Sequence, residues 1–193
     1  SVPVLKIQAG DWKMNREFLW QHIRLGLPMA FQTSIIAIGA VILQIALNGL
    51  GPVAVASYSA AQKVETIALM PMMSFGIAMA AYTAQNYGAK KFSRIRQGVN
   101  QCIMMSVAFS ILIGLFNVVF GSQLMALFVG DAEPQVIEYG QVYLTATGCS
   151  YWVLALLFIY RNTLQGLGQS VVPTVAGVME LVMRAGVALC LVG

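Results

Sequence analysis

The residues of this chain that could do chemistry are a few polar side chains within long apolar segments, and Glu180 and Arg184 are the most costly of them. Both lie in the stretch GVMELVMRAG. A charged side chain at the centre of a bilayer costs about 2.5 to 3.5 kcal/mol on insertion scales. Because the acid precedes the base by four residues, the two can pair on one face of a helix. Two interpretations remain open: an ion pair that fixes helix packing, or an ion-coupling site in which Glu180 takes up a proton or cation and Arg184 tunes it.

A second set of polar and polarisable side chains indicates a substrate cavity. Thr33, Gln44 and Asn48 share one face of an otherwise aliphatic segment, with small residues between them. Gln62 continues the pattern in the next segment, and Met73 adds a flexible side chain that adapts to varied apolar ligands. Such a face should not lie against lipid. Polar side chains also hold membrane helices together, so lining a cavity and packing between helices both remain possible roles.

A helix break is predicted at Pro71 in the stretch LMPMMSFG. Proline removes one backbone hydrogen bond and clashes with the preceding turn, so it kinks a helix. With Gly76 nearby, the kink predicts a hinge that bends during transport. A purely architectural kink is the alternative, since membrane helices tolerate proline.

The elements that must position these residues are membrane-spanning helices. Of all residues, 59% are hydrophobic and only 9% are charged, and the mean hydropathy is +0.76. The apolar runs exceed the roughly 20 residues that cross a bilayer, and they lack the strict alternation of a barrel strand. The sequence therefore predicts an all-α integral membrane protein with five spans, approximately at residues 24–47, 55–87, 96–120, 136–160 and 172–192.

Basic residues predict the orientation of these spans. They gather before the first span, between the second and third at Lys90, Lys91, Arg94 and Arg96, and between the fourth and fifth at Arg161. The positive-inside rule places these segments in the cytoplasm, as expected for a multi-pass protein of a bacterial inner membrane. Residues 1–23 combine aromatic and basic side chains, which predicts an amphipathic cytoplasmic segment at the headgroup level.

Several classes of function are not supported by the sequence. Hydrolase and nucleotide-binding motifs such as HExxH, GxSxG and the P-loop do not occur, so we expect no enzyme activity, no cofactor and no metal. The three cysteines stand singly in apolar segments, as small buried residues do. The net charge of +4 comes from the predicted inner loops, which favours anionic lipid headgroups over nucleic acid as partners. An odd number of spans and a start without Met suggest an excerpt of a longer protein.

Two stretches carry a resemblance to a known family. AYTAQNYGAKKFSRIRQG follows the proline-broken span, and IYRNTLQGLGQSVVPTVAGVMELVMRAG joins the last two spans. They resemble the C-terminal half of a bacterial multidrug and toxic compound extrusion (MATE) transporter, from about residue 24 to the end. The resemblance implies twelve helices in two six-helix lobes, and exchange of Na⁺ or H⁺ for organic cations. Residues 1–23 would be the cytoplasmic interlobe linker, and residues 24–193 an incomplete C-terminal lobe of helices seven to eleven that needs the absent N-terminal lobe.

The resemblance also implies which residues face the substrate. The cavity of the family lies between the lobes, and Gln44, Asn48, Gln62 and Met73 are on spans assigned to its wall. Thr145 and Trp152 in the fourth span could join them. Some members bind the coupling cation with carboxylates of the seventh and tenth helices. In other members the coupling acid lies in the N-terminal lobe, which would be absent here. Within this chain, Glu180 is the candidate by elimination rather than by motif.

We therefore expect a cation-coupled multidrug efflux antiporter that works by alternating access. One alternative from the same superfamily is an exporter or flippase for a lipid-linked sugar, which would need a more cationic cavity than Arg184 alone supplies. Another is a membrane scaffold subunit without transport, which would lack the polar stripe of Thr33, Gln44 and Asn48.

Overall fold

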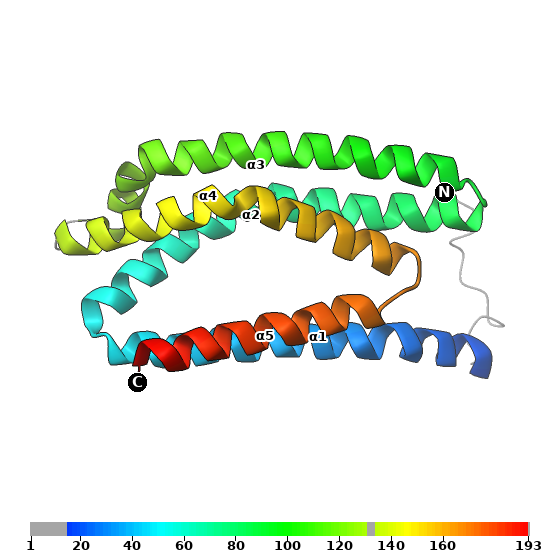
Figure 1. The fold of residues 1–193 in the computed structure, drawn as a ribbon, viewed down its shortest axis with the longest axis horizontal. Helices are drawn as coiled ribbons and strands as arrows, with labels where there is room; N and C mark the ends of the chain where they lie inside the picture. The colour runs from blue at the N-terminus through cyan, green and yellow to red at the C-terminus, as the bar shows by residue number, and fades with distance from the viewer. Residues whose placement is uncertain (1–14, 131–133, 193) are drawn as a thin grey trace, which may run out of the picture.

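The computed structural model describes residues 15–130 and 134–192, and these residues form five long α-helices (Figure 1). The helices are α1 (Arg16–Gly49), α2 (Pro52–Gly88), α3 (Phe92–Val129), α4 (Pro134–Gly166) and α5 (Val171–Val192). Within the described residues, α1 to α4 are each long and apolar enough to cross a membrane. The predicted all-α fold with five helices is confirmed.

Helices α1, α3 and α4 each run six or more residues past one end of their predicted spans, whereas α2 stays within three residues of its own. They contain 33 to 38 residues, which at 1.5 Å per residue is roughly 50 to 57 Å, against about 30 Å of hydrocarbon. The prediction that placed Arg161 in a loop was wrong, because α4 continues to Gly166. An apolar run marks the part of a helix that lies in lipid, whereas the end of the helix is set by turn residues. The turn residues here include Gly51, with φ +97° before Pro52, and Gly168, with φ +76° after α4.

The segment before the first predicted span is partly helical. Residues 1–14 lie outside the described residues. Asn15 caps α1 by accepting a hydrogen bond from the backbone N–H of Glu17 at 2.9 Å, as N-cap residues do. The residues from Arg16 to Ile23 therefore belong to α1 and do not form a separate amphipathic helix. Their role as part of an interlobe linker stays a prediction.

The helices pack as a group of three and a group of two, as Figure 1 shows. Helices α2, α3 and α4 contact one another extensively and are called here the α2–α3–α4 unit. Helices α1 and α5 run side by side in the same direction and form the α1–α5 pair. The pair touches α2 and α4 only sparsely. The lobe is thus two packed bodies joined along a seam.

The ends of the helices agree with the predicted orientation. The start of α1 and the α2–α3 and α4–α5 connections lie at one end of the structure (Figure 1). Lys90, Lys91, Arg94 and Arg96 lie in or next to the α2–α3 connection. This end is called the basic end below. The positive-inside rule predicts that this end faces the cytoplasm, and this orientation stays a prediction.

Small residues allow the helices of the α2–α3–α4 unit to approach closely. A Cβ built on Gly114 of α3 would lie 2.5 Å from the carbonyl oxygen of Gly148 in α4. In the same way, a Cβ on Gly166 would lie 2.5 Å from the carbonyl oxygen of Ala80 in α2. Close backbone contact of this kind drives helix association where the hydrophobic effect is absent. Helix α2, which contains Pro71, changes direction along its length (Figure 1).

Candidate functional site

The predicted pair of Glu180 and Arg184 forms, and a third residue joins it. A guanidinium nitrogen of Arg184 lies 2.8 Å from one carboxylate oxygen of Glu180. Arg161, from α4, lies 3.4 Å from the other oxygen. The side chain of Arg161 is 13% exposed and that of Glu180 is 30% exposed. These three residues are called the Glu180 cluster.

The contacts of the Glu180 cluster favour the interpretation as a packing ion pair. Two guanidinium groups surround one carboxylate, so a Na⁺ ion that approached Glu180 would be repelled by both. The cluster also links α4 to α5, which otherwise touch sparsely. Sequence reasoning missed Arg161 because the residue was assigned to a loop.

A cavity of about 240 Å³ lies between α1, α2 and α4 next to this cluster. It is called the α1–α2–α4 cavity. Its lining residues are Met29, Gln32, Thr33, Ile36, Met73, Ile77, Phe158, Arg161, Asn162 and Gln165. Thr33 and Met73, both predicted to face the substrate, thus lie on the same cavity although they come from different helices. Arg161 is the one charged residue in this lining among the described residues.

The polar wall of the α1–α2–α4 cavity was largely missed by the sequence. Gln32 is only 4% exposed, and its Oε1 accepts a hydrogen bond from Nε2 of Gln165 at 3.3 Å. Within the described residues, Nε2 of Gln32 and Nε of Arg161 are buried and have no hydrogen-bond partner. Gln32 immediately precedes Thr33 and does not fall on the stripe of Thr33, Gln44 and Asn48. Its amide was therefore not recognised as part of a site.

The other predicted cavity residues lie elsewhere. Gln44 and Asn48 bond to each other at 3.2 Å near the end of α1. Gln62 is exposed and donates to the hydroxyl of Tyr58 at 3.3 Å. The structure does not bring these three onto the α1–α2–α4 cavity, and their role in binding substrate stays a prediction.

Thr145 and Trp152 lie on the side of α4 that faces α3. Thr145 accepts a hydrogen bond at 3.3 Å from Nε2 of Gln141, and Gln141 also donates to a backbone carbonyl of α3. Trp152 lines a separate groove between α3 and α4, together with Gly114 and Gly148. The two residues therefore share a face of α4, but this face is not the one that lines the α1–α2–α4 cavity. Their role in binding substrate stays a prediction.

The predicted hinge residues occupy different surroundings. Gly76 is buried against α4, where an added Cβ would lie 2.6 Å from the side-chain nitrogen of Asn162. Space rather than flexibility is what glycine provides at this position in the packed structure. Pro71 lies five residues earlier in the same helix. Bending at these residues during transport stays a prediction.

Glu65 is a second carboxylate within a membrane-spanning helix, and it is half-buried. It is the fourteenth residue of α2, about 20 Å from the start of the helix. Its Oε2 accepts a hydrogen bond of 2.7 Å from the hydroxyl of Tyr143 in α4. A contact across 78 residues leaves no trace in local spacing.

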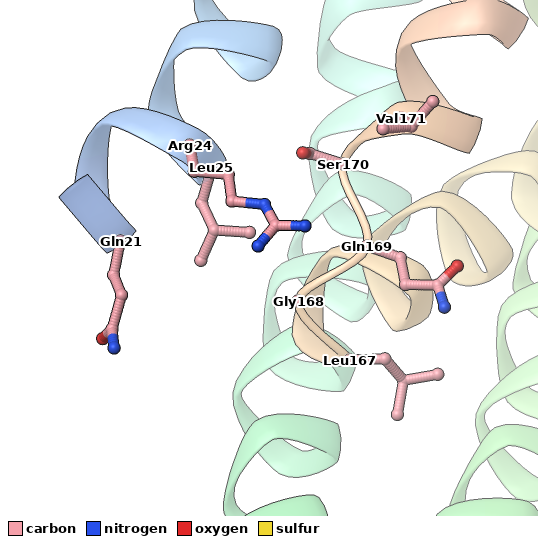
Figure 2. A pocket seen from close by; sticks show the side chains of 8 residues that line it. All are labelled: Gln21, Arg24, Leu25, Leu167, Gly168, Gln169, Ser170 and Val171. Atoms are coloured by element: carbon pink, nitrogen blue, oxygen red, sulfur yellow. The ribbon is translucent and has the colours of Figure 1, made fainter.

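A larger cavity, of about 580 Å³, lies at the basic end and contains none of the predicted site residues. Figure 2 shows Arg24 extending from α1 toward the connection of residues 167–171. No group of three His, Cys, Asp or Glu side chains that could hold a metal occurs among the residues the structure describes.

Comparison with known proteins then identifies the family. Residues 28–189 match the family model called MatE. The chain belongs to the MatE family. This confirms the predicted resemblance to the MATE family.

Three relatives carry names that bear on transport. The chain is 26% identical to "Probable multidrug resistance protein YoeA" of Bacillus subtilis, over 88% of this chain and 36% of that protein. It is 24% identical to "FAD transporter" of Shewanella oneidensis, over 85% of this chain and 36% of that protein. It is 23% identical to "Probable multidrug resistance protein NorM" of Thermotoga maritima, over 85% of this chain and 34% of that protein. The chain thus spans about a third of the length of these relatives.

A solved structure supports the same fold. A crystal structure of a MATE protein in complex with MaL6 superposes with a TM-score of 0.83 at 18% identity, covering 95% of this chain and 42% of that one. The five helices therefore have the arrangement of part of a MATE transporter. With the apolar helices, this agrees with a multi-pass protein of a bacterial plasma membrane.

Proposed function

We propose that this chain is the C-terminal lobe of a two-lobe exporter of organic compounds, organic cations among them, that works by alternating access. Residues 1–23 would link the lobes, and residues 24–193 would provide helices seven to eleven. The observation that supports this is the α1–α2–α4 cavity, which places Thr33 and Met73 beside polar side chains in a chain of the MatE family. Adaptable Met and aliphatic walls with a few polar groups suit varied amphipathic ligands.

Export against a gradient needs a coupling ion, and we assign Na⁺ or H⁺ to Glu65 rather than to Glu180. Glu180 already has two guanidinium partners. Glu65 has a neutral partner, the Tyr143 hydroxyl, and no ion pair within the described residues. A half-buried carboxylate of a membrane-spanning helix that has no ion-pair partner among the described residues is available to a proton or Na⁺, and ionisable groups within such helices often serve in transport.

The test uses the two-lobe transporter in liposomes, with a Na⁺ or H⁺ gradient imposed in turn and a fluorescent organic cation as the reporter. We expect transport to follow one gradient. Glu65→Gln should abolish this dependence on the gradient. Glu180→Gln should keep it, because its carboxylate serves packing, and so should Glu138→Gln, which changes an exposed acid of α4.

The outcomes separate the parts of this proposal. Loss of coupling in Glu180→Gln with coupling intact in Glu65→Gln would transfer the role to the Glu180 cluster. Folded protein that transports under neither gradient would refute the exporter and favour a scaffold role. Size-exclusion profiles of each variant establish that the protein is folded before transport is compared.

A further inference from the structure

The charge of the Glu180 cluster is unbalanced. Two guanidinium groups (+2) share one carboxylate (−1), so the cluster carries a net charge of +1. One carboxylate can balance only one of the two guanidinium groups, so one positive charge of the cluster stays unmatched. Arg161 is the more buried of the two arginines, with 13% of its side chain exposed against 42% for Arg184. An unmatched charge is costly in such surroundings.

Arg161 is also short of hydrogen-bond partners. A guanidinium carries five N–H donors, but the one side-chain partner found for Arg161 among the described residues is the oxygen of Glu180. Its Nε is buried without a partner. Gln32, which lines the same cavity, is also buried and has an amide nitrogen without a partner in the described part of the chain. The α1–α2–α4 cavity thus has a surplus of donors and positive charge.

Part of the lining of the α1–α2–α4 cavity is apolar. Met73 and Ile77 of α2 and Phe158 of α4 belong to it. At about 240 Å³, the cavity is somewhat smaller than the roughly 300 to 1,000 Å³ of whole-ligand pockets. It therefore suits one polar end of an amphipathic molecule and the adjoining apolar group, rather than a large molecule as a whole.

We infer that the α1–α2–α4 cavity binds the anionic group, a carboxylate or phosphate, of an amphipathic compound that the transporter exports. The guanidinium of Arg161 provides the charge and a planar set of donors that matches such oxyanions. Gln32, whose amide nitrogen is buried without a partner among the described residues, is a candidate for a further donor after a rotation of its amide. The apolar wall packs against the body of the compound. This inference rests on the proposed export function and adds acidic and zwitterionic compounds to its substrates.

The decisive experiment compares two ligands of nearly the same shape. Equilibrium dialysis of the purified two-lobe transporter would measure the binding of 2-naphthoate and of its uncharged analogue 2-naphthamide. A hydrogen bond to a charged group contributes about 1.5 to 3 kcal/mol, so we expect naphthoate to bind roughly ten- to a hundredfold more tightly. Equal binding of the two ligands would overturn the inference.

Variants locate the binding in the cavity. Arg161→Gln should remove the preference for naphthoate, and Gln32→Met should reduce it. Glu180→Gln should increase it, because the competing carboxylate is gone. Arg94→Gln and Gln123→Met make the same types of substitution at exposed positions outside the cavity, and they should leave the preference for naphthoate unchanged. If Arg161→Gln does not fold, the double variant Arg161→Gln, Glu180→Gln removes both partners and should also lack the preference. If the preference for naphthoate persists in Arg161→Gln or in this double variant, the proposed site is refuted.

Transport assays separate an exported compound from a lipid headgroup. We expect liposomes to transport naphthoate in a manner that needs Arg161. If phosphatidylglycerol instead displaces naphthoate and naphthoate is not moved, the site holds a lipid headgroup and the inference fails, although export of the organic cation can still stand. If neither the organic cation nor naphthoate moves, the proposed export itself fails, while dialysis still reports on anion binding.

Discussion

Replacing Gly114 by alanine tests whether backbone contact between α3 and α4 holds the lobe together. The added Cβ would lie 2.5 Å from the carbonyl oxygen of Gly148, whereas real Cβ atoms essentially never come within 3.0 Å of another heavy atom. The two helices must therefore separate locally by about half an ångström or more. The partner atom belongs to the backbone, so no side chain can turn away to relieve the contact.

The expected magnitude follows from two opposing effects. Overpacking costs about 1 to 3 kcal/mol, and alanine in place of glycine within a helix returns about 1 kcal/mol. We expect Gly114→Ala to reduce the free energy of unfolding by up to about 2 kcal/mol, which lowers the midpoint of thermal unfolding by up to roughly 8 °C. The assay is thermal unfolding of the purified transporter, followed by the loss of the monodisperse size-exclusion peak.

Gly26→Ala is the matched control, because nothing lies within 4 Å of a Cβ built at Gly26. This variant gains the same helix propensity without a clash, so its unfolding temperature should stay the same or rise. The reasoning is refuted if Gly114→Ala is as stable as Gly26→Ala, since the clash would then carry no energy.

Two further predictions concern the interior of the α2–α3–α4 unit. Asn117 donates a hydrogen bond to the hydroxyl of buried Tyr151 at 3.1 Å. A double-mutant cycle of Asn117→Leu and Tyr151→Phe, measured from unfolding in detergent, should give a coupling energy of about 0.6 kcal/mol, and at most about 1.7 kcal/mol. A coupling energy of zero would show that this bond does not stabilise the protein. Gly76→Ala should lower the unfolding temperature less than Gly114→Ala does, because the nearest neighbour of the added Cβ is the side chain of Asn162, which can rotate. A larger fall in unfolding temperature than that of Gly114→Ala would show that the helices cannot adjust at this position.

The sequence predicted the helices well because long apolar runs and charge-rich connections are local signals. It predicted the pairing of Glu180 with Arg184 for the same reason, since the two are one helical turn apart. It could not find the contacts of Arg161 with Glu180 or of Tyr143 with Glu65, which join different helices. Those depend on how the helices pack, and the sequence of one chain does not show which small residue of one helix faces which residue of another.

The same long-range contacts explain why the cavity lies at the seam between the α1–α5 pair and the α2–α3–α4 unit. Among the described residues, two side-chain hydrogen bonds cross this seam, from Gln165 to Gln32 at 3.3 Å and from Arg161 to Glu180 at 3.4 Å. Both involve residues that line the cavity. An anion bound to Arg161 would compete with Glu180 for the guanidinium and weaken one of these two bonds. A ligand shifts a conformational equilibrium only by binding one state better than another. The anion would bind better when the bond between Arg161 and Glu180 is broken, and so it would favour a state in which the α1–α5 pair separates from the α2–α3–α4 unit.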